Sequence, residues 1–172
     1  MKKILIWVGI VALSLQDYFK KQPIKPTRQQ QFFQTGATSQ AFIAGQKSVF
    51  TTAKKILTKY LSSPILGGKG YVEYTKKIGS REIRIWMYLG GGNWVTVNIY
   101  TIFDGILKRE ENLYHPNSKM QDFDIFFEKV ISEIFKSYYI VTENEDYLNL
   151  EGIAAAGDWE LALQIAKGQG LL

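Results

Sequence analysis

Hydrophobic and polar residues alternate with a period of two in the middle of the chain, between Lys69 and Asp104. In Arg81 to Leu89, aliphatic residues occupy one side of the alternation, and polar and aromatic residues occupy the other. The segment Trp94 to Phe103 repeats this pattern. A period of two, rich in β-branched and aromatic residues, is typical of strands buried on one face. We therefore predict a three-stranded antiparallel meander, whose weaker first strand, Tyr71 to Ile78, forms an edge.

Turn signals separate these strands. The first reversal is predicted at Ile78-Gly79-Ser80-Arg81 and the second at Leu89-Gly90-Gly91-Gly92-Asn93. The three consecutive glycines suit a tight reversal because glycine accepts positive φ angles without steric cost. After Asp104-Gly105, a fourth, short strand is predicted at Ile106-Leu107.

A helical period flanks the meander on both sides. From Ser39 to Leu61 the apolar residues share one face, and Ser62-Ser63-Pro64 ends the predicted helix. A second helix is predicted to begin at Ser118, with Gln121 as its capping-box partner. Its apolar stripe consists of Phe123, Phe126, Phe127, Val130, Ile131, Ile134 and Tyr138. After it we expect a strand over Tyr139 to Thr142 and an acidic turn over Glu143 to Asp146.

The tail, Ile153 to Ala166, predicts two helices separated by a Gly157-Asp158 turn, with Asp158 as the cap of the second. This junction resembles the one between the helices of a tetratricopeptide-type repeat, although a single copy is too few for such an array. The predicted fold class is therefore α+β. An antiparallel three- to four-stranded meander packs against two amphipathic helices, with an N-terminal hydrophobic segment and a C-terminal helix pair.

The N-terminus has its own pattern. Lys2 and Lys3 precede an apolar run from Ile4 to Leu15, as in the first two regions of a secretory signal. As a helix this run covers about 18 Å, against roughly 30 Å of bilayer hydrocarbon, so a membrane span requires the residues up to Phe19. We predict a signal peptide or membrane anchor over 1–19, a linker over 20–38 and one α+β domain over 39–172.

The predicted location is therefore membrane-anchored or exported. The alternative is a cytoplasmic domain that begins with a buried strand or core helix. The lysines that follow the apolar run oppose export under the positive-inside rule, so this alternative stays open.

The second face of the meander is the candidate ligand or partner surface. It combines aromatic rings with one cation and one amide: Arg84, Trp86, Tyr88, Trp94, Asn98 and Tyr100. Such a face can stack bases or sugars. Aromatic residues more often serve cores, so a sheet covered on both sides is the alternative.

Charge is distributed unevenly along a chain whose net charge is +5. Residues 1–68 hold ten Lys and Arg against one acid, whereas residues 111–172 hold four against eleven. The first predicted helix has a basic face formed by Lys47, Lys54, Lys55 and Lys59. A basic face of this kind can lie on anionic lipid or on a nucleic-acid backbone. More often it is simply solvated, and the two halves of the chain can also attract each other within one fold.

No motif predicts catalysis, and we expect no metal or cofactor. The chain has no cysteine, so it has neither disulfides nor thiolate nucleophiles. The glycine run lies between two strands and does not open a helix, which excludes a phosphate-binding loop. His115 is the only histidine and is predicted to lie in a loop. No spacing marks Glu73, Glu82 or Asp104 as an acid–base pair.

Three functions fit these patterns. The first is a membrane-tethered or exported, non-enzymatic interaction domain that binds a protein partner in a larger assembly. A helix across a curved antiparallel sheet, over residues 39–142, resembles the plan of periplasmic domains with the nuclear-transport-factor-like fold, such as those of bacterial secretion machinery. The resemblance rests on no motif and implies no site residues.

The second function is a cytoplasmic nucleic-acid-binding module that uses Arg84, Trp86, Tyr88 and the lysine helix. The third is a small-ligand carrier with a pocket between sheet and helix. Salt-dependent binding to RNA or DNA would distinguish the second from the first.

Overall fold

The structure, a computed structural model, describes residues 48–61, 65–66 and 70–172. These residues all belong to one compact unit, 35–172. The predicted anchor, the linker and the first part of the predicted basic helix, including Lys47, lie outside the described residues. Among the helices that are described, none is long and apolar enough to cross a membrane.

One antiparallel sheet forms the centre of the fold, with its strands in the order β1-β2-β3-β4-β5. The strands are β1 (Ile65–Leu66), β2 (Tyr71–Ile78), β3 (Arg81–Gly90), β4 (Trp94–Phe103) and β5 (Ile106–Pro116). Each pairs with its neighbours in sequence, so the sheet is a meander, as predicted. The sheet is larger than predicted, because β1 was not expected and β5 extends well beyond Ile106-Leu107. His115 consequently lies in a strand and not in a loop.

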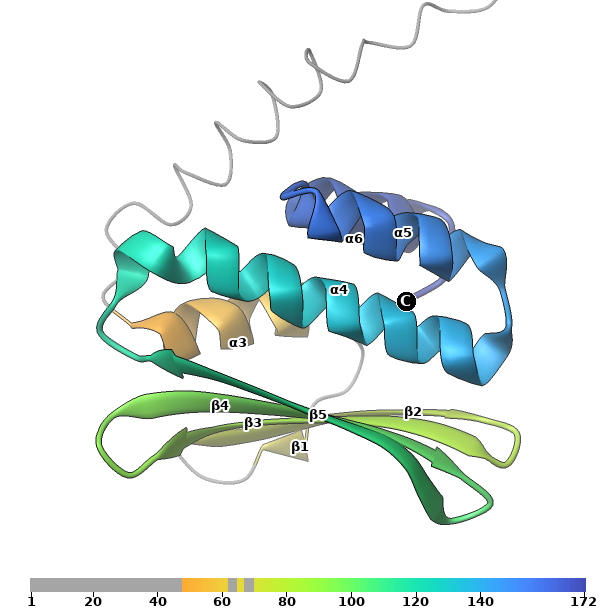
Figure 1. Cartoon of the computed structure of the whole chain (residues 1–172), viewed down its shortest axis with the longest axis horizontal. Helices are drawn as coiled ribbons and strands as arrows, with labels where there is room; N and C mark the ends of the chain where they lie inside the picture. Colours follow the sequence, from red (N-terminus) through yellow and green to blue (C-terminus); the bar gives the residue numbers. More distant parts are fainter. Residues whose placement is uncertain (1–47, 62–64, 67–69) are drawn as a thin grey trace, which may run out of the picture. The chain divides into compact units, whose positions relative to one another are not determined.

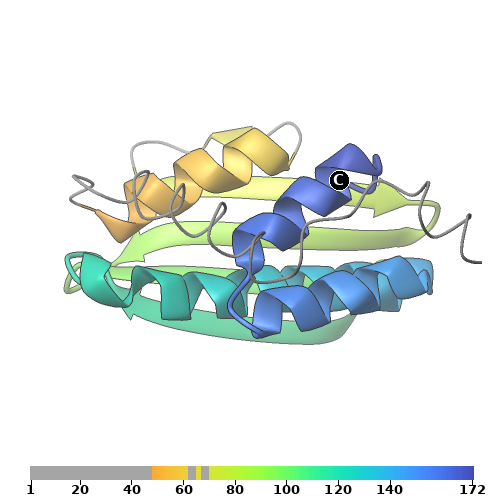
Figure 2. The same ribbon diagram turned by 90° about the horizontal axis from the view of Figure 1, so that it is seen from above.

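The α-helices of the described residues all lie on one face of the sheet (Figure 1). They are α3 (Val49–Tyr60), α4 (Phe123–Thr142), α5 (Glu145–Ala155) and α6 (Trp159–Gly168). Seen from above, α3 and α4 run side by side over the sheet (Figure 2). The pair α5 and α6 forms a further layer on α4. The α+β class and the C-terminal helix pair are therefore confirmed.

The core lies between the sheet and the helices. Of the aliphatic side of the strand alternation, Ile83, Ile85, Val95 and Val97 are at most 2% exposed, whereas Leu89, near the end of β3, is 38% exposed. The whole predicted stripe of α4 is buried as well. Trp159 of α6 packs edge-on against Phe127 of α4, with ring centroids 4.9 Å apart. A void between the sheet and the helices, lined by Leu61, Tyr74 and Tyr138 among others, measures about 10 Å³.

The helix boundaries correct several predictions. Residues 139–142 form the last turn of α4 and not a strand, because Tyr138 and Val141 remain buried and the Thr142 hydroxyl bonds back to the Tyr138 carbonyl at 2.7 Å. Glu143, at φ +57°, ends the helix. The predicted acidic turn is largely the start of α5, whose N-cap is Asn144.

The predicted caps of α4 and α6 also differ from the structure. Ser118 does not cap α4, because a 3₁₀ turn, Met120–Asp122, precedes the helix and Asp122 is its N-cap residue. Asp158 occupies the N-cap position of α6, as predicted, but its side chain makes no capping hydrogen bond.

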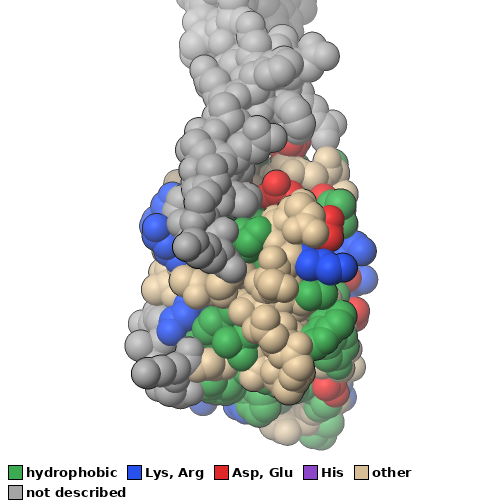
Figure 3. Space-filling model, turned by 90° about the vertical axis from the view of Figure 1, so that its left-hand side faces the viewer, with side chains coloured by type: hydrophobic (Ala, Val, Ile, Leu, Met, Phe, Trp, Pro, Cys, Tyr) green, Lys and Arg blue, Asp and Glu red, His purple; other side chains and the backbone are tan. Residues whose placement is uncertain are grey.

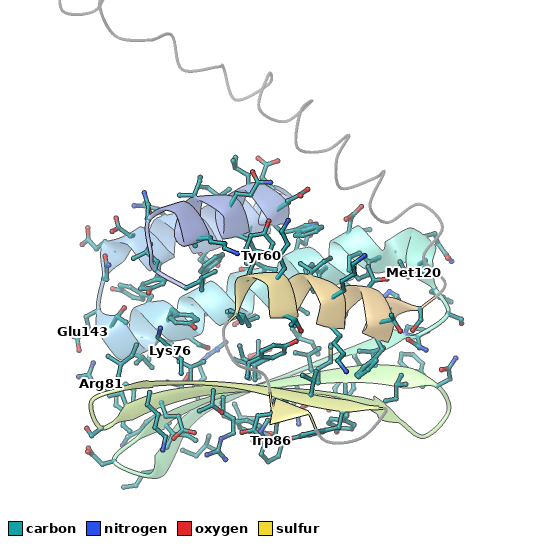
Figure 4. All side chains as sticks on the ribbon, turned by 180° about the vertical axis from the view of Figure 1, so that it is seen from behind. Tyr60, Lys76, Arg81, Trp86, Met120 and Glu143 are labelled. Atoms are coloured by element: carbon teal, nitrogen blue, oxygen red, sulfur yellow. The ribbon has the colours of Figure 1, made fainter. Side chains whose placement is uncertain are left out.

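Two ion pairs join the sheet to α4. Arg109 of β5 reaches Glu133 of α4, and it also donates to the Ser137 hydroxyl at 3.2 Å. At the other end of α4, Arg81 pairs with Glu143 at 2.9 Å and donates to the Val141 carbonyl at 2.8 Å (Figure 4). Charged residues on the inner face of β5 are therefore accommodated by partners on the helix above.

Asn117, which follows β5, holds the start of α3. Its side-chain oxygen accepts from the Phe50 N–H at 2.9 Å and from the Ser48 hydroxyl at 2.8 Å, and its carbonyl accepts from the Val49 N–H at 2.9 Å. Its own N–H and amide group reach Asn93, in the turn between β3 and β4. These bonds satisfy amide groups at the first turn of α3 that have no partner within the helix.

Candidate functional site

The outer face of the sheet is the side that carries no described helix, and Trp86 projects from it (Figure 4). Cross-strand registers set its side chains in rows, because residues directly opposite in an antiparallel pair share a face. One row is Glu73, Trp86, Asn98 and Asn112; the next is Thr75, Arg84, Tyr100 and Glu110; a third is Tyr71, Tyr88, Thr96 and Tyr114. Five of the six predicted surface residues therefore lie in these rows. The sixth, Trp94, lies at the start of β4, opposite Gly90 and Pro116.

Four of those six, Arg84, Trp86, Asn98 and Tyr100, form one contact network. The Trp86 and Tyr100 rings meet edge to face, with centroids 5.1 Å apart and planes at 70°. The Arg84 guanidinium lies 5.9 Å from the Trp86 ring centroid. Asn98 Nδ2 donates to the Tyr100 hydroxyl at 2.9 Å. With Tyr71 and Glu73, these residues are called the outer-face cluster below.

Tyr71 and Glu73 were not predicted as site residues. The Tyr71 ring lies 6.4 Å from that of Trp86, and its hydroxyl donates to Glu73 at 2.9 Å. β2 was predicted as a weak edge strand because Lys76 and Lys77 disturb its pattern, but β1 pairs with it at Val72 and Glu73. Its register against β3 could have identified both residues, since Glu73 lies directly opposite Trp86.

Ionic contacts neutralise the only cation of the cluster. Arg84 Nη2 lies 2.7 Å from Glu82, and Arg84 Nε lies 3.5 Å from Glu73. Both carboxylates are largely shielded from solvent, with 14% and 16% of their side chains exposed. The two acids therefore hold Arg84 as a salt bridge and are not arranged as an acid–base pair.

The protonation of the cluster follows from these contacts. Burial alone would raise the pKa of Glu73, but hydrogen bonds from Tyr71 and Thr75, the nearby Trp86 indole and the Arg84 charge outweigh it and lower the pKa. Burial, with the hydrogen bond to Glu73, raises the pKa of Tyr71 to about 12. At neutral pH the pair is a carboxylate that accepts from a neutral phenol.

Two buried polar atoms of the cluster have no hydrogen-bond partner among the described residues. They are the Trp86 indole nitrogen, a donor, and the Asn98 amide oxygen, an acceptor. The indole adds to the lowering of the Glu73 pKa, although its nitrogen makes no hydrogen bond of normal geometry. Buried polar groups are nearly always paired in folded proteins, so these two atoms mark the cluster as a polar site.

The remaining predicted residues lie apart from this cluster. Tyr88 shares the face but makes none of the ring contacts described above. Trp94, at the start of β4, is 46% exposed and faces a hollow of about 500 Å³ along β5. This hollow also contains His115, which sequence reasoning had set aside.

The lysines of the predicted basic face lie on the helix side of the molecule. Lys54, Lys55 and Lys59 belong to α3. Lys59 and Lys167 both lie over the Tyr60 ring, at 5.0 and 5.6 Å, and Lys167 donates to the Lys59 carbonyl at 2.9 Å. The sheet therefore separates the lysines of α3 from the outer-face cluster.

Among residues 48–61, 65–66 and 70–172, no group of three or more His, Asp or Glu side chains is placed to hold a metal ion. Comparison with protein-family models, with curated proteins and with solved structures finds no match to this chain. No comparison therefore supports the predicted resemblance to nuclear-transport-factor-like domains.

Proposed function

We propose that this chain is a non-enzymatic interaction domain, tethered to a membrane or exported through its N-terminal segment, that binds a protein partner with its outer sheet face. The observation that supports this proposal is the outer-face cluster itself. It presents half-buried rings on a face without a described helix, and beneath them lie two buried polar atoms that have no hydrogen-bond partner among the described residues. Aromatic residues that combine apolar area with a polar group are characteristic of the centres of protein interfaces.

The charges of this face favour a protein over a nucleic acid. The face carries the acids Glu73, Glu82 and Glu110, and its central cation, Arg84, is already paired. Binding to a phosphate backbone depends on unpaired positive charge. The rings also pack edge to face on one another and do not offer flat stacking surfaces.

The packing of the interior argues against a carrier with its ligand between sheet and helix. The void that Leu61, Tyr74 and Tyr138 line there is about 10 Å³, close to the minimum for a single water molecule. A drug-sized ligand needs a pocket of about 300 Å³ or more. The outer face is therefore the better candidate for recognition.

The proposed location rests on the sequence of residues 1–19, which lie outside the described residues. Sequencing the N-terminus of the protein from cells distinguishes a cleaved signal from an intact segment. Fractionation then distinguishes an intact anchor, which we expect in the membrane fraction, from a cytoplasmic protein. Recovery of the intact chain only in the soluble cytoplasm would refute the tethered or exported location.

Site-specific photo-crosslinking in cells tests the partner surface. A photo-reactive residue at Tyr88, on the outer face, is expected to give a discrete protein adduct. The matched control is the same residue at Gln164, which is exposed on α6. Arg84→Glu should abolish the Tyr88 adduct, because it places a third acid beside Glu73 and Glu82. No adduct at Tyr88, or one that nuclease removes, would contradict the proposal.

A further inference from the structure

We propose a second binding site, along the free edge of β5, that takes an extended peptide segment with an acidic side chain from a partner protein. The site goes beyond the function proposed above, since it uses other residues and another mode of recognition. Its elements are backbone groups, apolar side chains and charge.

The backbone of β5 offers an open edge. β5 pairs with β4, and within the described part of the chain no strand pairs with its other side. Asn117, the next residue in register, donates its N–H to Asn93 at 2.9 Å. In an antiparallel ladder the bonded direction alternates, so the N–H and C=O groups of Tyr114, Asn112 and Glu110 point away from β4. Extended peptides add to such edges by main-chain hydrogen bonds.

The two ends of β5 are not equally suited to pairing with an added strand. At the first end, a register shift between Thr101 and Ile102 leaves Lys108 without a partner in β4. Bulges and edge lysines protect strands from unwanted pairing. The register is regular from Glu110 to Pro116. Proline there breaks no ladder bond, because the N–H that it lacks would point outward. An added strand therefore fits best along residues 110–116.

Exposed apolar side chains gather around this strand. Tyr114 is 60% exposed, and Ile125 of α4 is 59% exposed. Both line the hollow of about 500 Å³, together with Trp94, Leu113 and Phe126. Figure 3 shows one end of the molecule, where hydrophobic side chains lie beside Lys and Arg side chains. A hollow beside an open edge is where alternate side chains of an added strand would insert.

The charged residues around the hollow favour a bound peptide that carries an acidic side chain. Lys119 and Lys129 line it, against the single acid Asp122, so its rim is net positive. Both lysines are exposed and can reach a carboxylate of a bound peptide.

His115 adds a polar ring atom to the hollow. Its ring is 8% exposed and lies 4.8 Å from the Phe126 ring. Nδ1 lies 2.8 Å from the Pro116 carbonyl, which can only accept, so Nδ1 donates to it. Nε2 has no hydrogen-bond partner among the described residues, so it suits a polar group of the bound segment.

The experiment is selection of a random peptide library, displayed on phage, on the full-length chain. Enriched peptides are then synthesised, and their affinity is measured by fluorescence anisotropy. We expect them to alternate β-branched or aromatic residues with polar ones and to include at least one acid. Asn112→Pro removes an outward N–H but no bond to β4, and it should weaken binding about tenfold or more. Lys129→Glu should weaken binding by a similar factor, although it changes no residue of β5.

The control is Lys136→Glu, an equal change of charge on α4 at a residue that does not line the hollow. It should leave affinity within about twofold of the unmodified chain, and thermal unfolding of each variant shows whether it is folded. The proposal is overturned if no peptide is enriched, or if the selected peptides bind both test variants as tightly as the control. It is equally overturned if the only effect of Asn112→Pro is to convert a dimer of the chain into monomers. It is also overturned if the selected peptides lack acidic residues and small aromatic acids displace them completely from the chain.

Discussion

Trp86 and Asn98 lie directly opposite one another on β3 and β4, and each has one buried polar atom without a hydrogen-bond partner among the described residues. The first is a donor and the second an acceptor. An unpaired buried donor costs about 1–3 kcal/mol of stability. Replacing Trp86 and Asn98 by a well-packed apolar pair should therefore lower the stability of the fold very little.

Trp86→Phe is expected to leave the free energy of unfolding within about 1 kcal/mol of the unmodified chain. Loss of the unpaired N–H offsets the loss of ring area. The matched control is Trp159→Phe, because the Trp159 indole does donate, to Asp124 at 3.2 Å, and its ring is buried. That variant should lose about 2 kcal/mol in urea unfolding. Equal losses in the two variants would show that the Trp86 N–H is paired in solution.

Arg84→Gln is expected to destabilise the fold at neutral pH and much less in acid. The pKa of Glu73 is lowered, against burial, by hydrogen bonds from Tyr71 and Thr75 and, to a smaller extent, by the Arg84 charge, so the stability from this pair is present above the unfolded pKa. It is lost as the pH falls through the folded pKa. With 35% of the Arg84 side chain exposed, the loss at neutral pH should be about 1 kcal/mol or less.

Urea unfolding at neutral pH and below pH ~4 measures this difference. Arg84→Lys is the control, since it keeps the charge but lacks the planar fork that contacts both acids. A loss that is the same at both pH values would mean that Arg84 acts through packing and not through charge.

Glu133→Gln should cost more than Glu143→Gln, although both acids join α4 to the sheet. The Arg109–Glu133 pair is well shielded, with 19% and 22% of the side chains exposed. Without Glu133, the half-buried Arg109 charge keeps only the more exposed Glu111, at 3.1 Å, so the change should cost about 1–2 kcal/mol. The Glu143 side chain is 75% exposed, so its loss should cost less than about 1 kcal/mol. Chemical denaturation ranks the two, and the reverse order would refute this account.

Gly92→Ala should destabilise the turn between β3 and β4, whereas Gly91→Ala should not. Gly92 has φ +75°, where a Cβ is strained, and its Cβ would also lie 3.5 Å from the Trp94 ring. We expect a loss of about 1–2 kcal/mol. Gly91 has no positive φ and nothing within 4 Å, so its change should stay within about 0.5 kcal/mol. Thermal unfolding of the two variants measures the difference, and equal stabilities of the two would contradict the prediction.

The period of two identified β3 and β4 correctly, because each buries one face and exposes the other. It failed for most of β5, whose inner face carries Arg109 and Glu111 in place of apolar residues. These charges are tolerated because Glu133 and Ser137 of α4 pair with Arg109. No local pattern contains that information, since the partners lie more than 20 residues away in the sequence.

Tertiary packing likewise overrode local preference at residues 139–142. A β-branched, aromatic run favours a strand, but burial of Tyr138 and Val141 continues the helix through it. The shared face of Arg84, Trp86, Asn98 and Tyr100 was predictable from alternation alone. The addition of Tyr71 and Glu73 was not, because it depends on the register of β2 against β3.

The contacts of Asn117 imply an order of folding. The strands β2 to β5 form from hairpins that close over short loops, whereas Phe50 meets Asn117 across 67 residues of sequence. Long loops close slowly, and the first turn of α3 is anchored only after the end of β5 is in place. Docking of α3 is therefore a late event, and its amides should exchange with solvent hydrogen before those of β3 and β4.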